Sequence, residues 1–379
     1  MARSALSQGF ENQQQTGTQG FFQSIHIDWP LMTGILVLVA SGLIVLYSAS
    51  GEDWNIMTRQ MIWLFIALTV MVLTAQIPPH HLEFWAPWVF GIGLMFLVMV
   101  LLFGDVGKGA QRWLNLGLFK FQPSEMMKFA VPMMVAWYMA SRPLPPSLKR
   151  IFIALLIILI PVGLIAKQPD LGTSILVGSA GLFVLLFTGI SWFFVGGFLV
   201  LLAAIAPVIW FFYMHDYQRQ RVLTFLHPEN DPLGSGYHII QSKIAIGSGG
   251  LYGKGWLNGT QSQLDFLPER STDFIFAVFA EEFGLVGVIG LLAIYLYIIF
   301  RGLVIAVQAQ SSFGRLLAGS LVLTFMVYII VNIGMVSGLL PVVGVPLPLV
   351  SYGGTSLVTL MVAFGILMSI HTHRKLLTS

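Results

Sequence analysis

The sequence contains no cysteine, and only 9% of its 379 residues are charged. The absence of cysteine excludes disulfide bonds, thiolate catalysis, cysteine-ligated zinc and iron–sulfur clusters. The scarcity of charge excludes an ordinary soluble domain, in which about 25% of residues are charged. The formal net charge of +3 is small and comes with no basic cluster, so no nucleic acid is expected as a partner.

What the sequence has in abundance is hydrophobic residues, which make up 56% of the chain. They gather in ten runs that meet or approach the roughly 20 residues that a helix needs to cross a bilayer. We therefore predict an all-α, polytopic membrane protein with about ten transmembrane helices. A polar tail at 1–28 precedes a single transmembrane domain at 29–379. The predicted spans are 30–49, 60–77, 84–103, 124–140, 151–166, 171–188, 192–213, 283–300, 316–340 and 355–370.

One boundary and the orientation of the chain depend on local signals. The spans at 151–166 and 171–188 are predicted to be separate, because Pro169 between them would break a continuous helix. An even number of spans places both termini on the same side of the membrane. The total count of Lys and Arg does not favour a cytoplasmic location for them, whereas the basic residues close to the ends of short loops do. The residues alone therefore leave the orientation open.

The longest polar segment, the loop at 214–273, is predicted to connect spans seven and eight. It holds 11 of the 35 charged residues of the chain. A membrane protein that concentrates its ionisable groups in one loop is expected to bind or react there. Asp273 ends this loop at the border of water and apolar protein, where a carboxylate suits a general base. The alternative is a carboxylate that stabilises the start of a helix, with Ser271 or Thr272 as its cap.

A second group of candidate site residues surrounds the polar connection at 104–125. Glu125 and Lys128 are three residues apart, so they share one helix face. They could form a structural ion pair, or Lys128 could face a cavity that binds an anion. Arg112 could join the same site, and Trp113 could stack on a sugar or lie in the interfacial aromatic belt. Asp170 is expected to cap a helix.

Two glycine patterns also bear on function. The segment 247–259 lacks the spacing of a phosphate-binding P-loop, so it predicts tight turns, and no nucleotide or organic cofactor is expected. Gly284, Gly287 and Gly290 recur every three residues in the eighth predicted span. This spacing could permit close approach of a partner's transmembrane helix, or it could serve packing within the chain.

Several segments together resemble the shape, elongation, division and sporulation (SEDS) family. The resemblance extends over most of the chain from about residue 30 onward. The segments that carry it are GKGAQRWLNLG, FQPSEMMKFAVP, QPDLGTS, HDYQRQRV, GSGYHIIQSKIAIGSGGLYGKGWLNGTQSQLDFLPERSTDFIFAVFAEEFGLVG and PVVGVPLPLVSYGG. The match at these motifs leaves only the glutamine-rich N-terminal tail as an individual feature of this chain.

The resemblance implies a peptidoglycan glycosyltransferase of the bacterial inner membrane, with cytoplasmic termini and a periplasmic active site. Its substrate would be lipid II, a disaccharide-pentapeptide on undecaprenyl pyrophosphate. Its partners would be a class B penicillin-binding protein and the elongation machinery. The family's essential aspartate corresponds to Asp273, which would act as the base. The other important positions correspond to Arg112, Trp113, Glu125, Lys128 and Asp170.

The expected chemistry agrees with these residue types. Cations such as Lys128 and Arg112, or a bound divalent ion such as magnesium or manganese, could stabilise the charge on the pyrophosphate leaving group. The alternative is a translocase that moves lipid II between leaflets. A translocase needs polar groups near mid-membrane, so the position of Asp273 in the long loop favours polymerisation.

Overall fold

The computed structural model describes residues 26–107, 110–115, 120–214, 216–231, 234–264, 266–267 and 269–374. The predicted tail at 1–28 therefore lies almost wholly outside the described residues. Helices dominate the described part of the chain, and the strands recorded there form one small three-stranded sheet. The prediction of an all-α membrane protein is confirmed.

Each of the ten predicted apolar runs coincides with a helix of the described chain. Seven of the described helices are long and apolar enough to cross a membrane. Because α5, α7 and α8 fall below those limits of length or hydropathy, ten spans remains a prediction. The ten helices are α2 (Trp29–Ala49), α3 (Trp54–Ala75), α4 (Pro79–Phe103), α5 (Pro123–Ala140), α6 (Leu148–Lys167), α7 (Leu171–Phe187), α8 (Trp192–Val208), α12 (Ile275–Gln308), α13 (Ser312–Val336) and α14 (Gly354–Thr372).

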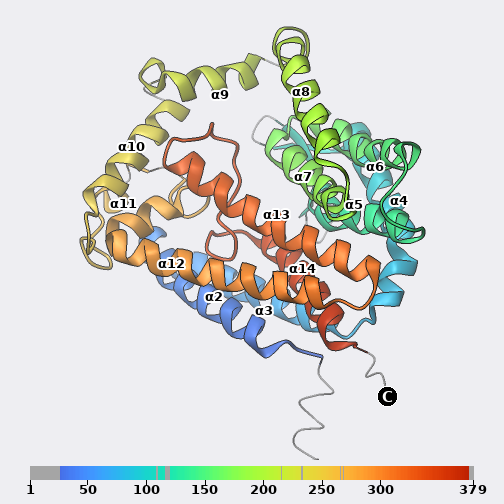
Figure 1. The fold of residues 1–379 in the computed structure, drawn as a ribbon. Coiled ribbons are helices and arrows are strands. Elements are labelled where there is room, and N and C mark those ends of the chain that lie inside the picture. Colours follow the sequence, from blue (N-terminus) through green and yellow to red (C-terminus); the bar gives the residue numbers. More distant parts are fainter. Residues whose placement is uncertain are drawn as a thin grey trace, which may run out of the picture.

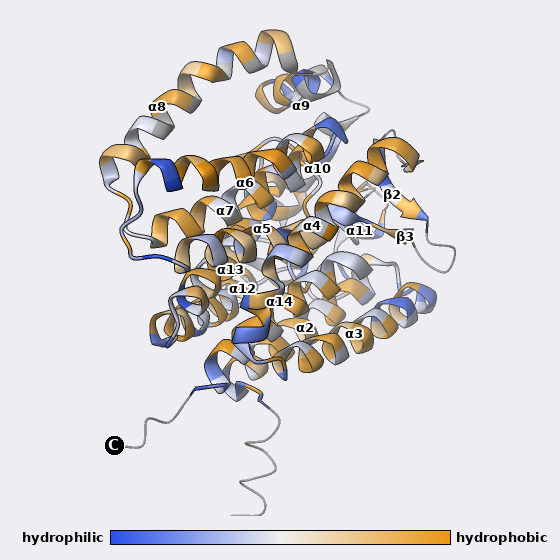
Figure 2. Ribbon diagram, turned by 90° about the vertical axis from the view of Figure 1, so that its right-hand side faces the viewer, coloured by the Kyte–Doolittle hydropathy of each residue, from blue (hydrophilic) through white to orange (hydrophobic). Residues whose placement is uncertain are grey.

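Two helices form the centre of the bundle. Helix α13 packs against α12, α7, α5 and α14, and α5 packs against α4, α6, α7 and α13 (Figure 1). The chain turns between α6 and α7 at Pro169, so the predicted break between these two helices is confirmed. Helix α8 continues into a π-helical turn, η1 (Ile209–Tyr213), and stands apart from the bundle (Figure 2). Most of its described side chains are exposed, including Trp192 and Phe193.

The two long polar connections are more ordered than loops. The first contains the antiparallel strands β1 (Asp105–Gly107), β2 (Ala110–Asn115) and β3 (Lys120–Phe121). The second, the long loop, contains α9 (Asp216–Leu226), the 3₁₀ turn η2 (Pro228–Asn230), α10 (Ser235–Ser248) and α11 (Thr260–Gln263). These short helices follow one side of the bundle, and α10 packs on α12 (Figure 1).

A buried ionic cluster joins both ends of the described chain. Asp28 caps α2, and its carboxylate lies 2.5 Å from the Arg301 guanidinium of α12 and 2.7 Å from His371 Nδ1 of α14. Burial alone would raise the pKa of Asp28, but His371 and Arg301 together hold it well below its usual range. His26 stacks on His373, with 3.8 Å between ring centroids. The two ends of the described chain therefore lie side by side, far along α12 from Asp273.

Helix α12 is interrupted at Gly284, whose φ of 63° and ψ of −165° are not helical. The interruption removes the helical partners of backbone groups on both sides, and such groups are costly when buried without hydrogen bonds. The glycine-rich segment 250–255 supplies the missing bonds. Its amides donate to the carbonyls of 281–282, and its carbonyls accept from the amides of 285–286, all at 3.0 Å. We call this set of four backbone bonds the kink clamp.

Side chains reinforce the kink clamp. The fully buried carboxylate of Glu281 accepts hydrogen bonds from the Lys254 ammonium at 2.7 Å and from the Gln261 amide at 3.0 Å. The neighbouring carboxylate of Glu282 accepts a hydrogen bond from the Ser48 hydroxyl of α2. Glu281 therefore binds the long loop to the first half of α12, and Glu282 binds the same half to α2.

Of the two uses predicted for Gly284, Gly287 and Gly290, the structure supports packing within the chain for the first two. Gly284 forms the kink, and a Cβ at this position would lie 2.3 Å from the Gly253 nitrogen. A Cβ at Gly287 would lie 2.3 Å from the Phe283 Cβ. Gly290 alone of the three faces open space, because a Cβ there would meet nothing within 4 Å in the described chain. The first two glycines therefore serve packing within the chain.

Replacing Gly284 with alanine should destabilise the protein. The backbone region that Gly284 occupies costs a residue with a side chain about 1–3 kcal/mol, and the added methyl would also displace segment 250–255. We expect Gly284→Ala to lower the melting temperature in detergent by several degrees. Gly290→Ala, on the same helix but facing open space, is the matched control and should not lower it, because alanine favours a helix more than glycine does. Equal melting temperatures for both variants would contradict this account of the kink.

Candidate functional site

Asp273 lies at the end of the long loop, directly before α12, and its side chain is partly buried. The three consecutive carbonyls of residues 271–273 each accept a hydrogen bond from elsewhere in the chain. The donors are the Tyr352 amide at 2.9 Å, the Ser351 hydroxyl, and the Asn332 amide group at 2.9 Å, respectively. Asp273 is therefore held through its backbone by α13 and by the segment that precedes α14.

The predicted cap at this helix start is wrong. The N-cap of α12 is Phe274, which makes no side-chain capping bond. The Thr272 hydroxyl donates to the Glu269 carboxylate at 2.8 Å instead. The turn from Ser271 to Asp273 is thus fixed by bonds to its carbonyls, because the segment before α14 lies alongside it.

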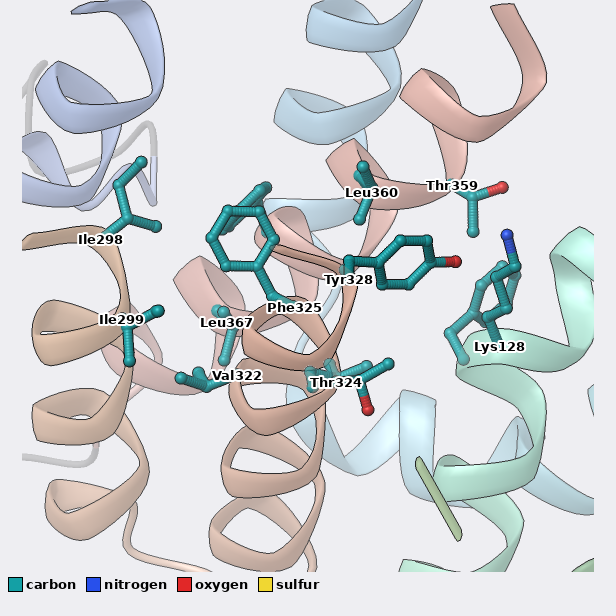
Figure 3. A pocket seen from close by; sticks show the side chains of 14 residues that line it. Lys128, Ile298, Ile299, Val322, Thr324, Phe325, Tyr328, Thr359, Leu360 and Leu367 are labelled. Atoms are coloured by element: carbon teal, nitrogen blue, oxygen red, sulfur yellow. The ribbon is translucent and has the colours of Figure 1, made fainter. Parts of the chain in front are cut away.

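Glu125 and Lys128 form the predicted ion pair on the first two turns of α5, with 2.5 Å between Lys128 Nζ and Glu125 Oε1. Both residues are only 7% exposed, so the charges depend on each other for compensation. The Lys128 ammonium also lies 5.0 Å from the centre of the Tyr328 ring, which reaches it from α13 (Figure 3). Glu125 Oε2 has no hydrogen-bond partner among the described residues.

A small cavity adjoins Lys128 between α5, α12, α13 and α14 (Figure 3). Its volume is about 30 Å³ and its walls are mostly apolar, with Thr324 and Thr359 among the polar exceptions. A single water needs roughly 10–15 Å³ measured in this way. The cavity can hold about two or three waters beside Lys128, and it is too small for a sugar-pyrophosphate group.

Arg112 owes its direction to an irregularity in the sheet. Asp105 pairs with Trp113 and Val106 pairs with Gln111, so Arg112 is the extra residue of a β-bulge on β2. Bulges re-aim side chains and are common beside active sites. The Arg112 guanidinium donates to the carbonyls of Gln168 and Pro169 in the turn before α7.

Asp170 is the next residue of that turn, and its carboxylate contacts groups from three segments of the chain. It caps α7 by accepting a hydrogen bond from the Thr173 amide at 3.3 Å, as the sequence predicts. Its carboxylate also lies 4.0 Å from Arg112 Nε and accepts a hydrogen bond from Gln122 at 3.2 Å. Because Gln122 precedes α5 by one residue, it links the Arg112–Asp170 pair to the helix that carries Glu125 and Lys128.

The structure therefore assembles four of the predicted residues in one polar cluster. They form two pairs, Arg112–Asp170 and Glu125–Lys128. Gln122 links the two pairs through its hydrogen bond to Asp170 and its place one residue before α5. Trp113 is partly buried on β2 beside Arg112.

Helix α13 contacts both this cluster and the backbone of Asp273. Tyr328, which covers Lys128, and Asn332, which binds the Asp273 carbonyl, are four residues apart on α13. They therefore lie on one face, about 6 Å apart along the helix axis. The described contacts place a buried cation and the backbone of Asp273 against adjacent turns of one helix.

Sequence reasoning missed Gln122, Tyr328 and Asn332. Asn332 had a detectable signal, because it is a lone amide inside a long apolar run and polar residues within spans are usually functional. Tyr328 had none, since a tyrosine in a membrane helix is ordinary. Gln122 gains its role from the fold of the chain around Asp170, which local sequence does not reveal.

Comparison with known proteins identifies close relatives. The family model described as cell cycle protein, for FtsW, RodA and SpoVE, matches residues 24–376. The peptidoglycan glycosyltransferase MrdB of Escherichia coli K12 is 59% identical over 94% of this chain and 97% of its own length. The peptidoglycan glycosyltransferase RodA of Treponema pallidum is 32% identical over 92% of this chain and 98% of its own length.

Solved structures share the fold. One is a chain in a solved structure described as the structural coordination of polymerization and crosslinking by a peptidoglycan synthase complex. It is 32% identical to this chain, with a TM-score of 0.80. The alignment covers 92% of this chain and 99% of that one. The crystal structure of Thermus thermophilus RodA gives a TM-score of 0.70 at 28% identity, over 92% and 98% of the two chains. The chain belongs to the FtsW, RodA and SpoVE family of cell cycle proteins, the SEDS family that its motifs resemble.

Proposed function

We propose that this protein is a peptidoglycan glycosyltransferase that polymerises lipid II into β-1,4-linked glycan strands for lateral cell-wall elongation and rod shape. The observation that carries the proposal is the arrangement on α13, which links the Asp273 backbone to the buried Lys128 through adjacent helical turns. The 59% identity to a peptidoglycan glycosyltransferase supports the same reaction. Purified protein supplied with labelled lipid II should form glycan chains.

The reaction needs a base for the acceptor more than an acid for the leaving group. A sugar hydroxyl is a poor nucleophile, and a carboxylate that removes its proton raises its reactivity. Asp273 is proposed as that base. Undecaprenyl pyrophosphate is already a good leaving group, so a single displacement would invert the anomeric centre of an α-linked donor and give a β-linked product.

The polar cluster is proposed to bind the pyrophosphate. Lys128 and Arg112 carry fixed positive charge, which stabilises the charge that develops on the departing phosphate. Glu125 holds the Lys128 ammonium, and Asp170 holds the turn against which Arg112 lies. Trp113, next to Arg112 on β2, is proposed to contact a sugar of the substrate.

A divalent cation, magnesium or manganese, is a further proposal for this cluster. No group of three or more His, Cys, Asp or Glu side chains among the described residues could hold a metal alone. Magnesium is usually bound by one or two carboxylates together with substrate phosphates. Glu125 Oε2, buried and without a hydrogen-bond partner in the described chain, suits one such contact. The ion would neutralise negative charge on the pyrophosphate.

The topology and the partner are proposed from the same comparisons. The two ends of the described chain meet at the Asp28 cluster, at the far end of α12 from Asp273. We place that end in the cytoplasm and the Asp273 end in the periplasm of the bacterial inner membrane. The partner is proposed to be a class B penicillin-binding protein of the elongation machinery, in line with the similarity to a chain of a peptidoglycan synthase complex.

Replacing Asp273 with asparagine should abolish polymerisation, because the amide cannot accept the acceptor's proton. The measurement is glycan formation from labelled lipid II in detergent. Glu229→Gln is the matched control, since Glu229 belongs to the same loop and its side chain is 74% exposed. The control should retain full activity, and normal glycan synthesis by Asp273→Asn would remove this residue from the mechanism.

Replacing Lys128 with methionine should reduce turnover, because it removes the charge that faces the pyrophosphate and leaves Glu125 buried without its cation. Lys149→Met, at an exposed lysine on the start of α6, is the control and should not change turnover. Binding and polymerisation of lipid II at normal rates by Lys128→Met would limit the ion pair to a structural role.

Removing divalent cations with a chelator should lower turnover, and added magnesium or manganese should restore it. The melting temperature of the substrate-free protein should not change on chelation, because the proposed ion needs substrate phosphates to complete its coordination. Undiminished turnover in the chelator would rule out the metal.

A further inference from the structure

Asn332 is the polar residue on which this inference rests. It lies near the end of α13, in an apolar helix, and is 0% exposed. A buried amide in apolar surroundings is costly unless it forms hydrogen bonds. The hydrogen bonds of Asn332 must therefore offset the cost of burying its amide.

The amide of Asn332 uses both of its donor hydrogens on backbone carbonyls. Its Nδ2 donates to the Asp273 carbonyl at 2.9 Å and to the Val345 carbonyl at 2.8 Å. The orientation of the amide follows from chemistry, because a flipped side chain would place its oxygen against two carbonyl acceptors. Asn332 Oδ1 has no hydrogen-bond partner among the described residues. The two donated bonds are therefore what offsets the burial of this side chain.

Asn332 thereby joins three segments: the end of the long loop, α13, and the segment 340–353 that follows α13. The last of these segments approaches Asp273 from a second direction. Gly344 has a φ of +74°, and a Cβ on it would lie 3.5 Å from Asp273 Oδ2. The Ser351 hydroxyl, which donates to the Thr272 carbonyl, adds a third point of attachment.

We infer that Asn332 is a positioning residue that sets Asp273 relative to the polar cluster, with Ser351 as its auxiliary. This inference rests on the proposed role of Asp273 as the base. The link to the cluster is Tyr328, which lies one turn from Asn332 and covers Lys128. Helix α13 therefore fixes the distance between the groups that would act on the acceptor and on the leaving group.

Loss of this positioning should slow the chemical step. A displacement of about 1 Å at a reacting group can reduce rate about 100-fold. Asn332→Leu keeps the size of the side chain and removes both donors, so it should lower kcat at least about tenfold by the same reasoning. The KM for lipid II should stay unchanged, because the binding groups of the polar cluster remain in place.

Ser320→Ala is the matched control. Ser320 is on α13, is 0% exposed, and donates to the Ala180 carbonyl at 2.6 Å. Its loss removes the same kind of bond from the same helix, away from Asp273. Ser320→Ala should lower the melting temperature without lowering kcat, so a loss of kcat that is specific to Asn332 is not a general effect of stability.

Ser351→Ala tests the inference independently of whether Asn332→Leu folds. It removes one of the three bonds to residues 271–273 and should also lower kcat with KM unchanged. If every folded variant of Asn332 and Ser351 keeps the kcat of Ser320→Ala while Asp273→Asn is inactive, the positioning role is overturned. Activity of Asp273→Asn would instead overturn the proposed base.

Discussion

Backbone hydrogen bonding in apolar surroundings is the constraint on which the rest of this structure depends. A helix that stops and restarts within a membrane protein exposes amides and carbonyls that no water can satisfy. At Gly284 the long loop supplies those bonds through segment 250–255. The kink and the loop therefore require each other. Because Asp273 lies between the loop and the first half of α12, the same bonds that compensate the kink also restrict where Asp273 can lie.

Charge burial follows the same rule of compensation. The buried carboxylates of Asp28 and Glu281 each contact a cation from another segment. These two pairs bind distant parts of the chain together and lie away from the proposed site. The Glu125–Lys128 pair differs because both of its charges come from one helix. Glu125 Oε2 has no hydrogen-bond partner in the described chain, as is also true of Glu281 Oε2. An ion pair within one helix ties no distant segments together, so the Glu125–Lys128 pair is the one that we propose for ligand binding.

The sequence was sufficient for features that depend on local patterns. The apolar runs predicted the helices, Pro169 predicted the break before α7, and the spacing of Glu125 and Lys128 predicted their pairing. The sequence was insufficient where a feature depends on contacts between two segments of the chain. The bulge that directs Arg112 depends on pairing with β1, and the role of Asn332 depends on carbonyls 59 and 13 residues away. Both depend on tertiary contacts that periodicity and propensity do not encode.

Asp273 is consequently anchored on both sides along the chain. Before α12, the carbonyls of 271–273 are bound by α13 and by the segment before α14. After it, the half-helix 275–283 is bound by the kink clamp and by Glu281. Groups that stabilise developing charge act best when they are fixed before the reaction, because no energy is then spent on orienting them. Two independent sets of hydrogen bonds fix the backbone around Asp273 in this way, which is what its proposed role as a base requires.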